Sequence, residues 1–230
     1  MPRLNDSFLQ SKAIMRCALS VALLILTSAA FTQTVKQSNS HSHDLVWEPP
    51  EWNFPQEVKA SVPREMFSTF RLSGYGITFE ETSIESVQKH LGGKTGQRGD
   101  AGDALNWLCF HGADAVGRWV IWLESGEIDG GSVGSFQWQR LSNRDVPDSR
   151  CHALSGEAVN LPLSLRLGAT KAEVLKNLGQ PTSSDTGRLI YLHEHEGTIR
   201  GEPFTTSNIV VVRIKNGLVW AIQASKTSSS

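Results

Sequence analysis

The chain has 230 residues and a formal net charge of −1, with 22 Lys and Arg against 23 Asp and Glu. Charges of both signs are interspersed, so we expect no binding to nucleic acid. The length allows one domain or two small ones.

The N-terminus has the pattern of an export signal. Lys12 and Arg16 precede an apolar run from Ala18 to Leu26, and small residues follow that run. A charged region, an apolar region and a small-residue cleavage site predict a signal peptide over residues 1–30, with Met15 as an alternative start. The run is shorter than the roughly 20 residues that span a bilayer. We therefore expect a periplasmic or secreted protein without a membrane span after cleavage; an uncleaved anchor is the alternative.

Two cysteines, Cys109 and Cys151, remain after the signal peptide. Two cysteines in an exported protein predict one disulfide. By the loop-entropy model, closing a loop of about 43 residues stabilises the fold by roughly 4 kcal/mol. The alternative is a buried free Cys109 and an exposed free Cys151.

The segment after the signal, residues 31–63, is predicted to be a leader and Pro-rich linker. Its prolines between Trp47 and Pro55 exclude a regular helix or a central strand. The stretch either packs on its own domain by its aromatic rings or serves as a ligand for a partner. From Arg64 to Leu72 we predict a helix, with Pro63 at its first position.

The next part of the chain predicts a helix followed by strands. Residues Ser83 to Gly92 begin with a capping serine, carry apolar residues at helical spacing and end with glycine. Lys94 to Asp103 is predicted to be a glycine-rich loop, and Asn106 to His111 a strand. Arg118 to Glu124 and Ser135 to Leu141 are predicted to form a hairpin with a long connection.

A second short helix is predicted after Thr170. The Thr170 hydroxyl and the Glu173 carboxylate have the spacing of a capping box. Gly179 follows the last apolar position, and Pro181 lies just beyond it, so the helix ends there.

The last part of the chain predicts a tight hairpin. Asn216-Gly217 separates the apolar runs Asn208 to Lys215 and Leu218 to Ala224. Asn-Gly between such runs is the strongest short signal for a type I′ turn. Arg188 to His195 is predicted to be a third strand.

These elements predict an α+β protein of two tandem units. Each unit would pack a short helix, or a helix pair, on its own antiparallel sheet of three or four strands. The predicted boundaries are 64–145 for the first unit, 146–163 for a linker, 164–225 for the second unit and 226–230 for a disordered tail.

The second helix and its flanks carry the motif Leu167-Gly168-x-Thr170-x-x-Glu173-Val174, followed by Leu178-Gly179-x-Pro181. With a terminal hairpin, this motif resembles the SmpA/BamE-type domain of small bacterial outer-membrane-assembly lipoproteins. Two such units in one exported chain, with a cysteine pair in the first, are similar to the architecture of the secreted β-lactamase inhibitory protein. The resemblance predicts the fold much more specifically than it predicts the biochemical function.

Five aromatic residues cluster on the strands predicted in the first unit: Trp107, Trp119, Trp122, Phe136 and Trp138. Trp119 and Trp122 are three positions apart, so they point to opposite faces. Aromatic residues on an open sheet are typical anchors of a protein interface, and we predict that these five bind a partner. The alternative is that they pack under the segment Trp47 to Phe54.

Two further patterns indicate chemistry. Ser132 lies in a G-x-S-x-G sequence, with Asp185 and His193 later in the chain, as in a serine hydrolase. Its flanks are predicted strands, however, and a nucleophile elbow needs a helix after the serine. His193 and His195 alternate on a strand, about 7 Å apart on one face, where they could share a metal ion.

A third ligand for that metal is not evident, so a solvated strand end is the favoured interpretation. Asp100 and Asp103 lie in a glycine-rich loop without the calcium-loop pattern. We expect no cofactor. The favoured function is a non-enzymatic module of the bacterial envelope or secretome that binds a protein partner, with enzyme inhibition as one form; a small metal-dependent or serine hydrolase is the alternative.

Overall fold

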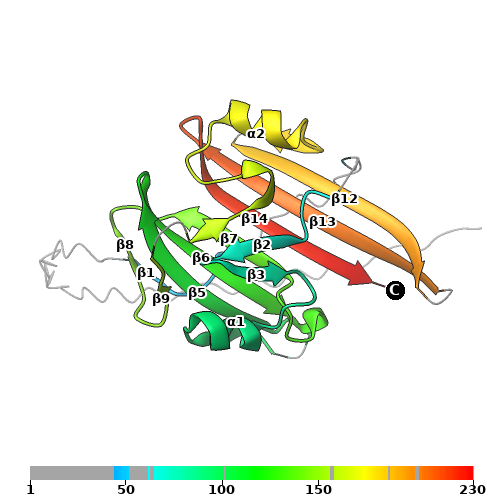
Figure 1. Ribbon diagram of the computed structural model, residues 1–230, viewed down its shortest axis with the longest axis horizontal. Helices are drawn as coiled ribbons and strands as arrows, with labels where there is room; N and C mark the ends of the chain where they lie inside the picture. Colours follow the sequence, from blue (N-terminus) through cyan, green and yellow to red (C-terminus); the bar gives the residue numbers. More distant parts are fainter. Residues whose placement is uncertain are drawn as a thin grey trace, which may run out of the picture. The chain divides into compact units, whose positions relative to one another are not determined.

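Figure 1 shows the computed structural model of the chain. The structure describes residues 44–51, 62, 65–100, 102–155, 158–185, 187–199 and 202–229. These residues belong to one compact unit of the chain. The predicted signal peptide, most of the leader and the predicted Pro63 helix start lie outside the described residues.

A nine-stranded sheet forms the centre of this unit. From one edge to the other it runs β11 (Ser183–Asp185), β12 (Arg188–Ile199), β13 (Glu202–Lys215), β14 (Leu218–Ser229), β7 (Ser135–Arg140), β6 (Gly117–Gly126), β5 (Leu105–Asp114) and β4 (Thr95–Arg98). Neighbours along this path are antiparallel. The ninth strand, β9 (His152–Ala153), pairs with β5 in parallel.

The predicted α+β class with two separate units is therefore wrong. The described residues are mostly β, with two α-helices, and the strands of both halves belong to one sheet. The joint is between β7 and β14, which pair from Ala221 opposite Gln139 to Ser225 opposite Ser135. Two separate sheets would each leave a strand edge with unpaired backbone groups, and pairing the two edges satisfies them.

Both α-helices lie where the sequence predicts them, α1 at Ile84–Leu91 and α2 at Lys171–Leu178. In α2, the Thr170 hydroxyl accepts from the Glu173 backbone N–H, and the Glu173 carboxylate accepts from the Thr170 N–H at 2.7 Å. Gly179 ends the helix with a φ of 83°. The predicted capping box and glycine stop are confirmed.

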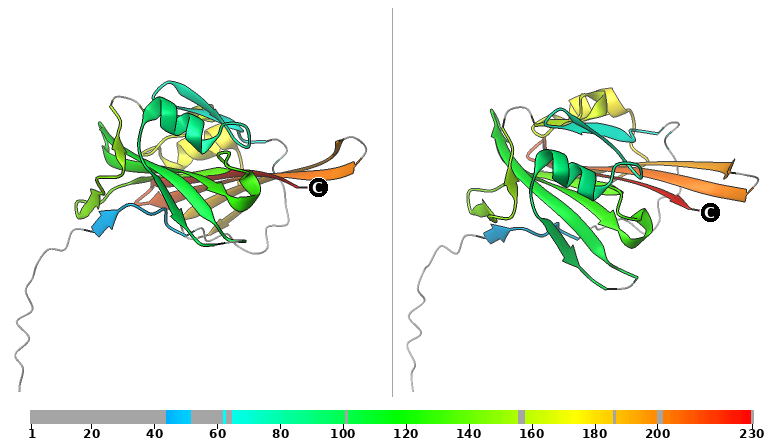
Figure 2. Two further views of the ribbon diagram at one scale, coloured as in Figure 1. Left: turned by 90° about the horizontal axis from the view of Figure 1, so that it is seen from below. Right: turned by 60° about the horizontal axis from the view of Figure 1, so that its bottom comes forward.

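The helices share one face of the sheet with a small second sheet (Figure 2). That sheet has the order β10 (Val159–Asn160), β2 (Thr69–Leu72) and β3 (Tyr75–Thr78). The helix predicted from Arg64 to Leu72 is therefore wrong. Phe70 and Leu72 are buried while their neighbours are exposed, which is the alternation of a strand with one covered face.

The main core lies between this layer and the sheet. The helices contribute Ile84 and Val87 from α1 and Val174 and Leu178 from α2. The covered face of the sheet contributes mainly large apolar side chains: Leu108, Phe110, Ile121, Leu123, Phe136, Tyr191, Val210, Val212 and Ile222. Burial of these side chains is the chief source of stability.

Residues 44–50 cover part of the opposite face. Strand β1 (Asp44–Val46) pairs in parallel with β8 (Asp145–Pro147). The Trp47 ring lies 5.7 Å from that of Trp107, and the Trp122 indole N–H donates to the Trp47 carbonyl at 2.9 Å. The predicted packing of the N-terminal aromatic segment on its own domain is confirmed for Trp47.

Buried polar side chains cross the joint on this opposite face. The Gln137 amide donates to the Glu124 carboxylate at 2.7 Å, and the Gln223 amide donates to the Gln137 carbonyl oxygen at 2.6 Å. These three residues come from β6, β7 and β14. Because each pair would lose its hydrogen bonds if the strands slipped, the chain of amides favours one register at the joint.

The terminal hairpin is confirmed, with a φ of 52° at Asn216 and 77° at Gly217. Its strands are longer than predicted. Residues 226–229, predicted as a disordered tail, continue β14 and pair with β13. Strand β4 lies within the predicted loop Lys94 to Asp103. Two 3₁₀ turns complete the described elements, at Glu127–Asp129 and Pro162–Ser164.

Candidate functional site

The five aromatic residues predicted to bind a partner are all buried. Each is at most 4% exposed: Trp107, Trp119, Trp122, Phe136 and Trp138. Trp119 and Trp122 do point to opposite faces, the first into the main core and the second toward Trp47. The five residues therefore form no exposed aromatic patch.

The predicted disulfide is confirmed. Cys109 of β5 is bonded to Cys151, with their Cα atoms 4.5 Å apart. Strand β9 begins at the next residue and pairs with β5. The bond thus fastens the segment after β8 to β5, the strand next to the edge strand β4.

The residues of the hydrolase alternative are held in other interactions. Ser132 lies between a 3₁₀ turn and β7, so a strand rather than a helix follows it. Asp185 binds the guanidinium of Arg188, and a ring nitrogen of His193 lies 3.0 Å from the Val62 carbonyl oxygen. This arrangement differs from a nucleophile elbow with its supporting base.

Neither the His193–His195 pair nor the Asp100–Asp103 loop acquires a further metal ligand from the described residues. His195 packs edge-on against Phe204, while His193 approaches the backbone of Val62. Asp103 accepts from the backbone N–H of Asp100 within its loop, at 2.9 Å. Among the described residues, no three His, Cys, Asp or Glu side chains are grouped so that they could hold a metal ion.

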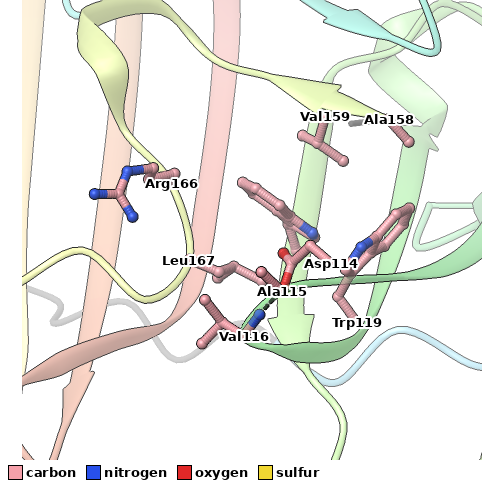
Figure 3. Close-up of a pocket in the computed structure, with 9 residues that line it drawn as sticks. Asp114, Ala115, Val116, Trp119, Ala158, Val159, Arg166 and Leu167 are labelled. Carbon is pink, nitrogen blue, oxygen red and sulfur yellow. Dashed lines mark hydrogen bonds between the residues drawn. The ribbon is translucent and has the colours of Figure 1, made fainter. Parts of the chain in front are cut away.

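A pocket does lie beside two of the predicted tryptophans (Figure 3). It has a volume of about 270 Å³ and opens between the β5–β6 turn and the segment that leads from β10 toward α2. Most of its lining is apolar: Ala115, Val116, Trp119, Trp138, Ala158, Val159 and Leu167, with Asp114 and Arg166 as the charged members. An apolar pocket with few polar groups is typical of a binding site.

Trp119 of β6 and Trp138 of β7 belong to the pocket wall. They are on the same face of neighbouring strands, and their rings meet edge to face with centroids 6.4 Å apart. The buried indole nitrogen of Trp138 has no hydrogen-bond partner among the described residues. Because buried N–H groups are nearly always paired, this donor is unusual.

Asp114 holds the turn that forms the front of the pocket. Its carboxylate accepts from the backbone N–H groups of Val116 and Gly117 and from the Arg140 guanidinium, at 2.8, 3.1 and 2.7 Å. Burial raises the pKa of Asp114, but the Arg140 and backbone donors outweigh burial and leave this pKa below its usual value. Asp114 therefore stays ionised and keeps the turn closed at neutral pH.

The turn presents a valine to solvent at the pocket rim. Val116 is 59% exposed, and its methyl groups lie 3.3 to 3.4 Å from the place where a Cβ on Gly168 would be. A second exposed apolar residue, Leu218, is 42% exposed and bridges to Thr170, two residues further along. The Val116 side chain thus lies against Gly168, next to the pocket, and the backbone of Leu218 pairs with Thr170 in the same segment.

The charges around the pocket are balanced. Arg166 pairs with Glu173 of α2 at 3.2 Å, on the exposed side. Asp114 pairs with Arg140. A strongly charged ligand would therefore find no uncompensated charge of opposite sign in these two pairs.

Sequence reasoning found two of the nine lining residues, Trp119 and Trp138. It missed the turn, although an apolar residue within Asp114-Ala115-Val116-Gly117, between two strands, is a signal. Ala158 and Leu167 could not be predicted as lining residues. The course of the chain after β9, which no local sequence pattern gives, brings them to the pocket.

Comparison with protein-family models, with curated proteins and with solved structures gives no match. The resemblance to SmpA/BamE-type domains therefore stays a prediction. Among the described residues, no helix is both long and apolar enough to cross a membrane.

Proposed function

We propose that this protein is an exported, non-enzymatic binding module that holds a protein partner at the pocket beside the β5–β6 turn. The observation that carries the proposal is the pairing of an apolar pocket with an exposed Val116 on its rim. A partner would insert one apolar side chain into the pocket and cover Val116. The tryptophans act as the rigid wall of the pocket, in place of the exposed anchors that the sequence suggested.

The size of the pocket fits a single anchor residue. Burying a Leu or Phe side chain contributes about 1.5–3 kcal/mol, and covering the exposed part of Val116 adds to that. A central apolar anchor surrounded by contacts that exclude water is the usual form of an interface hot spot. Leu218, which is 42% exposed, pairs through its backbone with Thr170, the residue before α2.

Export is part of the proposal. The disulfide between Cys109 and Cys151 supports it, because such bonds persist in oxidising compartments. We propose the periplasm or the extracellular medium as the location, with the predicted signal peptide of residues 1–30 as the route. The partner could be an enzyme that inserts a side chain from the rim of its active site. Binding would then cover that active site and inhibit the enzyme.

The test uses a photo-cross-linking residue in place of Val116. The control carries the same residue at Ile128, which is 81% exposed in the β6–β7 connection. After illumination in an extract of the source organism's envelope and medium, we expect a discrete protein adduct from position 116 and none from position 128.

A second pair of variants ties the adduct to the pocket. Ala115 is exposed and lines the pocket, so Ala115→Trp should fill the pocket and abolish the adduct formed at Val116. Ala113→Trp places the same ring on an exposed residue of the same hairpin, outside the pocket lining, and should leave the adduct unchanged. An adduct that survives Ala115→Trp, or equal adducts from positions 116 and 128, would refute the proposal.

A further inference from the structure

A second cavity lies where β9 pairs with β5, at the edge of the nine-stranded sheet that also carries β4. Its volume is about 500 Å³, within the range of roughly 300–1,000 Å³ that is usual for small-molecule sites. It shares no lining residue with the pocket beside the β5–β6 turn. Its polar lining residues come from the position before β4, from β5 and from the segment after β8: Lys94, His111, Asp148, Ser149, Arg150 and His152.

The carboxylate in this lining is already neutralised. Asp148 accepts from the Nε and Nη2 atoms of Arg150 at 2.8 and 2.9 Å. The Arg150 donors hold the pKa of Asp148 at about 2, so this carboxylate is ionised and paired at neutral pH. Lys94 is exposed and takes part in none of the ion pairs among the described residues. The lining therefore carries one uncompensated positive charge at neutral pH.

Two imidazoles in the lining can add positive charge. Burial lowers the pKa of the half-buried His111, and the charge of His152 lowers this pKa further. His152 is exposed and packs edge to face on Phe110, with centroids 6.4 Å apart. An anion in the cavity would favour the charged form of both rings, because it offsets their mutual repulsion.

These groups fit an anion better than a metal ion. Among the described residues no three metal-ligating side chains are grouped, and the carboxylate of this cavity is bound to Arg150. The Arg150 fork, which would suit a planar carboxylate, is occupied by the same bond. The groups that remain are one ammonium and two imidazoles, which donate as separate points and can each bind a different oxygen. A tetrahedral oxyanion offers an oxygen to each of them.

We infer that this cavity binds a tetrahedral oxyanion of the phosphate monoester type, held by Lys94, His111 and His152. The Ser149 hydroxyl, also in the lining, is a further donor. The cavity is large enough to admit part of the organic group that carries the phosphate. The inference does not rest on the proposed function, because the two cavities have separate linings.

The affinity for an anion should fall as the pH rises through the histidine range. An anion raises the pKa of both imidazoles, so binding takes up protons and is strongest where both rings are charged. The other charged groups facing His111 do not titrate there: Lys94 and Arg150 stay cationic, and Asp148 stays ionised. Glu48, which acts on Arg150 from the segment after β1, is an acid with an ordinary range well below neutral pH.

The experiment titrates the full chain with sulfate by calorimetry, at one ionic strength held with sodium chloride. Sulfate is tetrahedral and stays a dianion near neutral pH, so a pH dependence of its binding reports on the protein. We expect roughly 10-fold tighter binding at about pH 5.5 than at about pH 7.5. In the NMR spectrum of the imidazoles, sulfate should shift the signal of His111 and leave that of His195, on β12, in place.

Matched variants tie the binding to the cavity. Lys94→Met should weaken sulfate binding roughly 5-fold at both pH values. Lys89→Met removes an exposed cation from the last turn of α1, outside the lining, and should leave the affinity unchanged. His111→Gln should reduce the pH dependence. If this variant does not fold, the imidazole signals of the native chain decide.

Two further probes separate a free ligand from a lipid headgroup. Glycerol 3-phosphate carries a soluble phosphate monoester, and phosphatidylcholine vesicles with phosphatidic acid carry the same group on a membrane. Displacement of sulfate by glycerol 3-phosphate supports the site, and displacement by the vesicles supports it with a lipid source. Equal affinity at the two pH values, equal losses in Lys94→Met and Lys89→Met, or displacement by neither phosphate would overturn the inference.

Discussion

Asn208 provides the sharpest test of how the layer above the sheet is held in place. It is fully buried on β13. Its amide oxygen accepts from the backbone N–H of Met66 at 3.2 Å, and its amide nitrogen donates to the carbonyls of Phe67 and Ser225, each at 3.0 Å. One side chain thus joins the segment before β2 to two strands of the sheet.

Replacing Asn208 by Ala removes all three hydrogen bonds. At a net contribution of about 1 kcal/mol each, the free energy of unfolding should fall by about 3 kcal/mol. The loss exceeds that of a typical surface change because the Met66 N–H and the Phe67 carbonyl stay buried without a partner. Asn208→Asp keeps the acceptor for Met66 but loses both donors and buries a carboxyl group, so it should also destabilise the fold.

Urea unfolding followed by tryptophan fluorescence measures the change in the free energy of unfolding. Ser207→Ala is the matched control, since its hydroxyl donates to Glu194 at 3.4 Å on the exposed side; the effect of the substitution should stay within about 0.5 kcal/mol. Hydrogen exchange at Met66 gives a second readout and should accelerate in Asn208→Ala. A loss below about 1 kcal/mol, with the exchange rate at Met66 unchanged, would show that the amide does not hold this segment.

Two further predictions concern the face of the nine-stranded sheet that points away from the helices. Gly96→Ala should destabilise the fold by about 1–3 kcal/mol in thermal or urea unfolding, because its Cβ would overlap the indole of Trp107, whereas Gly76→Ala meets nothing within 4 Å and should be nearly neutral. An equal effect of both would contradict the close approach. Replacing Cys109 and Cys151 together by Ala should lower the free energy of unfolding by about 4 kcal/mol, and an unchanged urea midpoint would show that the bond does not constrain the chain.

Elements defined by neighbours in the chain were predictable. The helix after Thr170 depends on a cap and a glycine stop within ten residues, and the hairpin at Asn216-Gly217 depends on a turn of two. The disulfide was predictable because only two cysteines follow the predicted signal peptide, and two cysteines leave one pairing. In each case the residues that carry the signal also make the contact.

The fold class and the residues of the candidate site could not be predicted from patterns of neighbouring residues. The halves form one sheet because β7 and β14, about 80 residues apart, each have an edge that the other can pair, and no local pattern names the partner of an edge. The aromatic pattern showed which rings share a face. It did not show that Trp47 and the β2–β3 layer would cover those faces.

By itself the sequence determined both helix ends, the terminal hairpin and the partner of Cys109, since those features depend on steric and hydrogen-bonding preferences over a few residues or on a single possible pairing. Only the tertiary structure decided that Trp138 is buried beside a pocket, with a donor that has no partner among the described residues, and that Val116 lies at the pocket rim. Burial is a property of what lies across from a residue, and the chain that lies across from these two is distant in sequence.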